Sequence, residues 1–227
     1  MVALLVGITS QAQCARASPG HVTGLTTLGG CQGAYDLAVL ADDVLTVAAA
    51  ARLRQPVLVG HSLGALVGLV CAARPGAIRA LVMVDPAPIT NEPAKAFFRE
   101  SVDVVRGDED GSWRTSFARG MFLPTDAARR QAIIAGFPAV APGVAAAMLR
   151  AMGEFDGASL LGNVTVPVLS IGSAVPANSA ADLRRACPAI TVGQTVGAGH
   201  FIQLEVPDQV NAMIERFLAI TDLPAPP

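Results

Sequence analysis

A serine flanked by glycines stands between two apolar runs of the chain. The pentapeptide is Gly60-His61-Ser62-Leu63-Gly64, which follows a β-branched run at residues 57–59 and opens an apolar stretch that stops at residues 74–76. A serine at a sharp turn from strand to helix takes a strained backbone conformation that exposes its hydroxyl, and flanking glycines leave room for the close approach. Such a hydroxyl attacks carbonyl carbons once a base removes its proton. Ser62 is therefore the candidate nucleophile.

The base must be one of three histidines. His61 adjoins the serine, where we expect its side chain to point away from Ser62, and His21 lies in a stretch without periodicity. His200 follows the last predicted strand in a loop with glycines at 197 and 199. Because residues that follow parallel strands gather at the carboxyl edge of the sheet, His200 is the candidate base.

The glycine–serine turn and its flanking elements resemble the α/β-hydrolase superfamily from about Tyr35 onward, with an atypical, short N-terminal part. The resemblance implies an α/β fold with a mostly parallel central sheet, helices on both faces and a small helical cap. It also implies the chain order nucleophile, acid, histidine, which Ser62 and His200 fit.

The acid of the triad is open between two aspartates. Most relatives carry it just after the strand that here spans 166–171, yet no carboxylate occurs there before Asp182. Some relatives, among them haloalkane dehalogenases and cofactor-free dioxygenases, carry it one strand earlier, where this chain has Asp85. Position at a strand end favours Asp85, with Asp182 as the alternative. Ser62 in place of the dehalogenase aspartate argues against halide displacement.

The strand-to-helix turn at Ser62 and the resemblance also indicate further site residues. The N–H of Leu63 at the start of the helix is the expected oxyanion donor, and that of Ile8 is the second if residues 6–9 replace the His-Gly loop of relatives. For the substrate we expect contacts from the residues His61, Trp113, Phe117 and Phe201. Aromatic residues of a cap also serve simply to pack it onto the core, and that alternative stays open.

The resemblance implies a core formed by residues 1–90 and 163–223, with a cap at 91–162. Hydrophobic periodicity predicts the individual elements. Predicted strands are 2–8, 57–59, 78–84, 164–172 and 190–196, and 9–33 reads as irregular. Predicted helices are 35–53 with Asp36 as a possible cap, the run after Ser62, 92–106, 126–135, 144–152, 182–186 and 208–218.

Composition bounds the function. The 227 residues are 52% hydrophobic and 15% charged, which is typical of a compact globular protein. A net charge of -2 offers no basic surface for nucleic acid. The four cysteines lack metal-ligand or redox spacing, so we expect neither a zinc site nor a redox pair. Acyl transfer by a serine also implies no metal and no organic cofactor. Glycines and polar residues within 57–73 argue against a membrane span, and the opening residues lack the basic start of a signal peptide, so we expect a cytoplasmic protein.

These patterns predict a serine hydrolase that cleaves small to medium hydrophobic carboxylic esters through an acyl-enzyme, with lactones or other acyl compounds as close variants. A second class has the same fold but uses His200 and Asp85 as a base pair in cofactor-independent oxygenation or a lyase reaction. A third is a binding member without catalysis. The partner in the first two classes is a small molecule, and the oligomeric state stays open.

Overall fold

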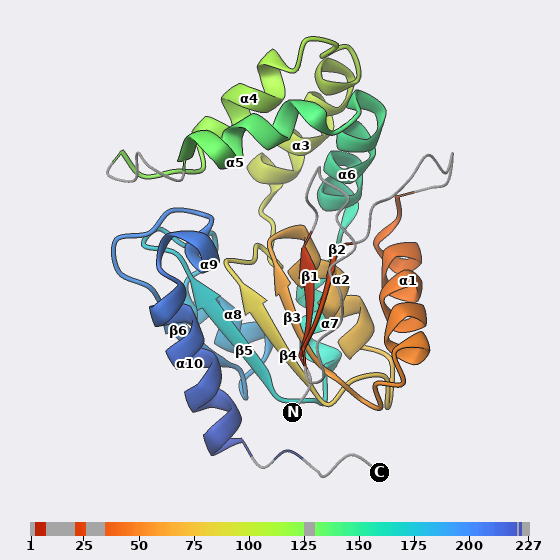
Figure 1. Ribbon diagram of the computed structural model, residues 1–227, viewed down its shortest axis with the longest axis vertical. Coiled ribbons are helices and arrows are strands. Elements are labelled where there is room, and N and C mark those ends of the chain that lie inside the picture. Colours follow the sequence, from red (N-terminus) through yellow and green to blue (C-terminus); the bar gives the residue numbers. More distant parts are fainter. Residues whose placement is uncertain (1–2, 8–20, 26–34, 125–129, 222, 224–227) are drawn as a thin grey trace.

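A six-stranded parallel sheet forms the centre of the protein (Figure 1). The computed structural model describes residues 3–7, 21–25, 35–124, 130–221 and 223. The strand order is β2-β1-β3-β4-β5-β6. The strands are β1 Ala3–Gly7, β2 His21–Leu25, β3 Val57–His61, β4 Ala80–Val84, β5 Val168–Gly172 and β6 Thr191–Gln194. Parallel strands place all carboxyl ends at one edge, and functional residues of open parallel sheets gather there.

Helices cover both faces of the sheet, and the side chains of its central strands alternate between them. Leu58, Leu81 and Met83 pack against one set of helices, whereas Val57, Val82 and Val84 face the other. The first set comprises α1 Leu37–Ala50, α2 Leu63–Ala72, α7 Gly157–Asn163 and α8 Ala180–Ala186. The second comprises α9 Ile202–Glu205 and α10 Pro207–Ile220. Burial on both faces explains why these strands are continuously apolar.

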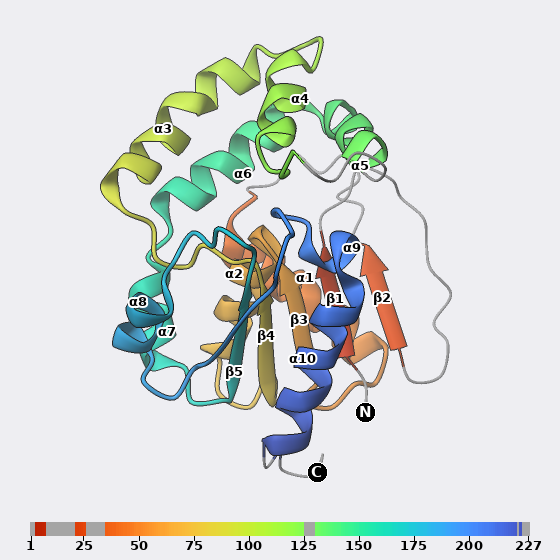
Figure 2. The same cartoon turned by 90° about the vertical axis from the view of Figure 1, so that its left-hand side faces the viewer.

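A separate layer of helices lies over the carboxyl edge of the sheet (Figures 1 and 2). It consists of α3 Glu92–Arg106, α4 Ser112–Arg119, α5 Arg130–Gly136, η1 Phe137–Ala139 and α6 Pro142–Glu154. We call this layer the cap. Val102 and Val105 of α3 pack against Ala146 and Leu149 of α6 in a small core of their own. The next helix, α7, returns to the main core, where Leu161 is buried.

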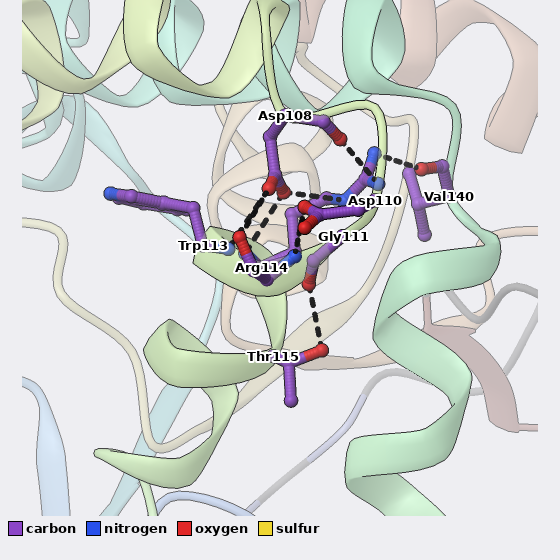
Figure 3. A network of polar contacts seen from close by, with 8 residues as sticks. Asp108, Asp110, Gly111, Trp113, Arg114, Thr115 and Val140 are labelled. Carbon is purple, nitrogen blue, oxygen red and sulfur yellow. Dashed lines mark hydrogen bonds and ion pairs between the residues drawn. The ribbon is translucent and has the colours of Figure 1, made fainter.

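A buried ion pair fixes the start of α4 within the cap (Figure 3). The Asp108 carboxylate accepts from the backbone N–H groups of Trp113 and Arg114 at 2.9 and 3.1 Å. The Arg114 guanidinium lies 3.2 Å from that carboxylate and donates to the carbonyl of Val140 at 2.7 Å. Burial raises the pKa of Asp108, but the two backbone donors and the guanidinium outweigh burial and hold this pKa below its usual value. The pair thus joins α4 to the segment that enters α6.

Most predicted elements are confirmed within the described residues, with boundary shifts of a few residues. Residues 2 and 8 of the predicted strand 2–8 and residues 126–129 of the predicted helix 126–135 lie outside the described residues. The helix that begins after Asp36 is confirmed, and the Asp36 carboxylate accepts from the N–H of Ala38 at 2.9 Å. The prediction of an irregular 9–33 is wrong in part, because β2 lies within it. The short helices α4, α7 and α9 were not predicted.

Among the residues that the structure describes, no single helix is long and apolar enough to cross a membrane. Residues 130–139 and 142–154 pass that test together by length and composition, but they are bent by 103° against each other.

Candidate active site

Ser62 occupies a strained turn between β3 and α2. Its backbone angles are φ 52° and ψ -120°, a region that non-glycine residues rarely adopt. The close approach at this turn leaves no space at Gly60, where an added Cβ would lie 2.3 Å from the carbonyl oxygen of Gly64. The Ser62 N–H donates to the carbonyl of Val84 at 3.0 Å, which holds the turn beside the end of β4. Strain stored at such a position is characteristic of functional sites.

Asp85 and His200 meet at the same edge of the sheet. The Nδ1–H of His200 donates to Oδ2 of Asp85 at 2.7 Å. The other carboxylate oxygen of Asp85 accepts from the N–H of Ser173 at 2.7 Å. Asp85 is buried, and its own N–H donates to the carbonyl of Ile171 at 2.7 Å. The carboxylate therefore fixes the tautomer of His200 that leaves Nε2 free to accept a proton.

Asp182, the alternative acid, lies elsewhere. It belongs to the first turn of α8, where its carboxylate accepts from the Ser179 hydroxyl at 2.6 Å and pairs with Arg185 at 2.9 Å. The Ser179 hydroxyl and then Arg185 lower the pKa of Asp182. His200 hydrogen-bonds Asp85 and not Asp182, so the geometry distinguishes the two aspartates that the sequence left open.

A cavity of about 380 Å³ opens beside Ser62, Asp85 and His200. Its remaining lining is mostly apolar, and Asp85 and His200 are its only titratable side chains among the described residues. The cap contributes Phe98, Gly120, Met121, Phe122, Leu123 and Met152, and the core contributes Leu63, Leu66, Ala87, Thr90, Ser173, Val175, Ala177, Ala198 and Gly199. A largely apolar cavity with a few convergent polar groups is typical of a small-molecule site.

Ser62 and His200 line this cavity together. Among the described residues, the structure contains no hydrogen bond between them, whereas the bond from His200 to Asp85 is formed. Catalytic hydrogen bonds are often long in ligand-free enzymes and tighten when substrate binds. The N–H of Leu63 is the first of α2 and so has no partner within the helix, and Leu63 also lines the cavity. Ile8 lies outside the described residues.

His61 packs behind His200 and is absent from the cavity wall. Its Nε2–H donates to the backbone carbonyl of His200 at 2.8 Å, and the two ring centroids are 4.6 Å apart. Burial, together with the nearby His200, lowers the pKa of His61 to about 3. His61 is therefore neutral near pH 7 and serves as a fixed donor.

The three aromatic residues expected to contact substrate also lie off the cavity wall. Trp113 and Phe117 stack on each other within α4, with ring centroids 5.0 Å apart. Phe201 is buried between the His61 and Phe122 rings, at 5.4 and 5.0 Å. The packing of Trp113 and Phe117 agrees with the alternative that cap aromatics serve to pack the cap, whereas Phe201 belongs to the core. Two aromatic residues of the cap, Phe98 and Phe122, line the cavity. The sequence did not single them out among the cap aromatics, and Phe98 could not be told from its neighbour Phe97.

In the part of the chain that the structure describes, no group of three or more histidine, cysteine or acidic residues could hold a metal ion.

Ser62 in its strained strand-to-helix turn (the elbow), the parallel sheet and the cap define an α/β hydrolase. The model of the alpha/beta hydrolase family matches residues 17–213, and the chain belongs to this family. No curated protein sequence matches the chain.

Three solved structures illustrate the likeness of fold. A hydrolase from Pseudomonas aeruginosa is 24% identical with a TM-score of 0.71, over 82% of this chain and 73% of its own. A thermophilic esterase from Thermogutta terrifontis is 18% identical with a TM-score of 0.76, over 96% and 89%. An enol-lactonase from Burkholderia xenovorans is 20% identical with a TM-score of 0.69, over 82% and 74%. At these identities the likeness shows the fold.

Proposed function

We propose that this hydrolase cleaves carboxylic esters through an acyl-enzyme on Ser62, with His200 as base and Asp85 as the acid that orients it. The observation that carries the proposal is the 2.7 Å bond from Nδ1–H of His200 to Asp85, beside the strained Ser62 on one cavity wall. A serine next to a correctly oriented imidazole, with a free helix N–H nearby, has the parts that acyl transfer requires.

In the proposed reaction, Nε2 of His200 takes the Ser62 proton while the serine oxygen bonds to the ester carbonyl carbon. The Leu63 N–H stabilises the oxyanion, and Ile8 is proposed as its second donor. The tetrahedral intermediate then expels the alcohol, which receives the proton from His200. Water, activated by the same imidazole, attacks the acyl-enzyme and releases the acid. The apolar cavity supports neutral, small to medium hydrophobic esters as substrates.

The test is mass-spectrometric mapping of a fluorophosphonate adduct, together with hydrolysis of p-nitrophenyl butyrate. We expect one adduct on Ser62, and loss of both labelling and turnover in Ser62→Ala. Unchanged turnover in Ser62→Ala would refute the proposal.

A second candidate rests on the observation that the Asp85–His200 bond is formed while none joins His200 to Ser62. The pair could act as a base in cofactor-independent oxygenation or a lyase reaction, with Ser62 only binding substrate. Oxygen uptake with a quinolone-type heteroaromatic compound, retained in Ser62→Ala, would favour this candidate. Absence of both activities and of labelling would favour a binding protein.

A further inference from the structure

One carboxylate binds the backbone on both sides of His200. The Gly199 N–H donates to Oε2 of Glu205 at 2.9 Å, and the Phe201 N–H donates to Oε1 at 3.0 Å. Glu205 ends α9, whose first residue follows Phe201 directly. Its bond to Phe201 is that of a carboxylate capping the start of a helix. Its bond to Gly199 lies outside the helix, so capping alone does not account for it.

The backbone of His200 itself is held by two other parts of the molecule. Its N–H donates to the carbonyl of Met121 in the cap at 2.8 Å. Its carbonyl accepts from Nε2–H of His61, at the end of β3, at 2.8 Å. The fit is close, because a Cβ added to Gly199 would lie 2.7 Å from the Met121 oxygen. Four hydrogen bonds thus fix the main chain from residue 199 to 201.

The side chain of His200 needs this support. The bond to Asp85 fixes one ring nitrogen, but the ring can still shift if the backbone that carries it moves. Proton transfer needs Nε2 within hydrogen-bond reach of the serine oxygen, and a misplacement of about 1 Å costs roughly 100-fold in rate. Three groups hold this backbone: the Glu205 carboxylate, the Met121 carbonyl and the His61 ring. Only Glu205 accepts from two backbone amides at once.

We propose that Glu205 is a positioning residue for His200, which it holds through the amides of Gly199 and Phe201. Glu205 does not line the cavity, so we assign it no contact with substrate. The inference rests on the proposed function, in which His200 is the base. It predicts that loss of Glu205 slows the chemical step and leaves substrate binding unchanged.

The experiment compares Glu205→Gln and Glu205→Ala with the wild type. Glutamine keeps one accepting oxygen, so we expect kcat for p-nitrophenyl butyrate to fall roughly tenfold in Glu205→Gln and further in Glu205→Ala, with KM within about twofold. The matched control is Glu215→Gln, which removes the same charge from an exposed site on α10 and should change neither constant. An equal kcat in the wild type and both Glu205 variants would overturn the proposal. So would variants in which KM and the melting temperature change while kcat does not.

A second readout is independent of turnover. Nitrogen-15 spectra of the histidine rings report whether Nδ1 of His200 stays protonated and bound to Asp85. We expect this signal to broaden or shift toward the other tautomer in Glu205→Gln, and to stay unchanged in Glu215→Gln. An inactive wild type with the expected ring signals would refute the proposed function alone. Unchanged ring signals in folded Glu205→Gln would refute the positioning role alone.

Discussion

Asp85 and His200 are 115 positions apart in the chain, yet their side chains lie 2.7 Å apart at the carboxyl edge of the sheet. The Asp85 N–H bonds to the end of β5, and the Ser62 N–H bonds to the end of β4. The register of neighbouring parallel strands thus brings Ser62 and Asp85, the proposed nucleophile and acid, to the same edge of the sheet. A proposed triad built in this way depends on Asp85 for the tautomer of His200.

The first prediction separates Asp85 from Asp182. In Asp85→Asn the amide can donate to Nδ1 and so favours the wrong tautomer, and we expect kcat/KM for p-nitrophenyl butyrate to fall roughly 10³–10⁴-fold. Asp182→Asn is the matched control, because it removes a carboxylate that bonds only within α8 and its cap residue Ser179. Steady-state kinetics with active-site titration measures both. A similar loss in both variants, or none in Asp85→Asn, would contradict the assignment.

The second prediction concerns the turn that exposes Ser62. A methyl group at Gly60 would lie 2.3 Å from the Gly64 oxygen, and the backbone there cannot yield without moving α2. We expect Gly60→Ala to lower the free energy of unfolding by about 2–4 kcal/mol and to reduce fluorophosphonate labelling of Ser62. Gly143→Ala is the control, since no atom lies within 4 Å of its added Cβ in α6. Denaturant unfolding that gives equal stabilities for both variants would refute the steric argument.

Three residues of the candidate site could be predicted from the sequence because each follows the end of a predicted strand. The elbow was predictable because a β-branched run, a glycine-flanked serine and an apolar helix occur together at residues 57–72. Asp85 could be preferred on position, since the end of a buried strand is a local signal. The choice of His200 as the base also depended on the order of nucleophile, acid and histidine along the chain. Each of these assignments depends on where a strand ends, which apolar periodicity indicates well.

The cavity wall could not be predicted in the same way. Phe97 and Phe98 are neighbours in sequence, yet Phe98 lines the cavity, while Phe97 is 45% exposed and stacks on Trp113. The rotation of a helix about its axis, which tertiary packing sets, decides between them. The strand β2 was missed because five residues with a glycine, at the edge of the sheet, carry little β signal.

The third prediction uses this pair of phenylalanines. Phe98→Ala enlarges the cavity on its cap side, and we expect the ratio of kcat/KM for p-nitrophenyl octanoate over acetate to rise roughly tenfold. Phe97→Ala removes the same kind of side chain from the neighbouring residue, which does not line the cavity, and should leave the ratio unchanged. The ratio is independent of the fraction of active enzyme, so a loss of stability in either variant does not affect it. Equal ratios in all three proteins would exclude Phe98 as a determinant of chain length.

The fourth prediction is a pH dependence of stability caused by His61. Its pKa is about 3 in the folded protein against an ordinary value of 6.5, so between these values the unfolded chain binds a proton that the folded protein does not. Protonation therefore favours the unfolded state: the stability that neutral His61 contributes is complete above pH 6.5 and is lost as pH falls toward 3. The difference is about 2 kcal/mol at pH 5 for a shift of this size.

Urea unfolding of the wild type and His61→Gln from pH 8 to pH 4 tests this linkage. Glutamine keeps an amide donor for the His200 carbonyl but has no proton to gain. The carboxylates titrate alike in both proteins, so the difference between the two stability curves isolates His61. We expect the curves to run parallel above pH 7 and the wild type to lose stability faster below pH 6.5. Curves that stay parallel down to pH 4 would show that His61 is protonated equally in both states, and hence that its ring is accessible to water when folded.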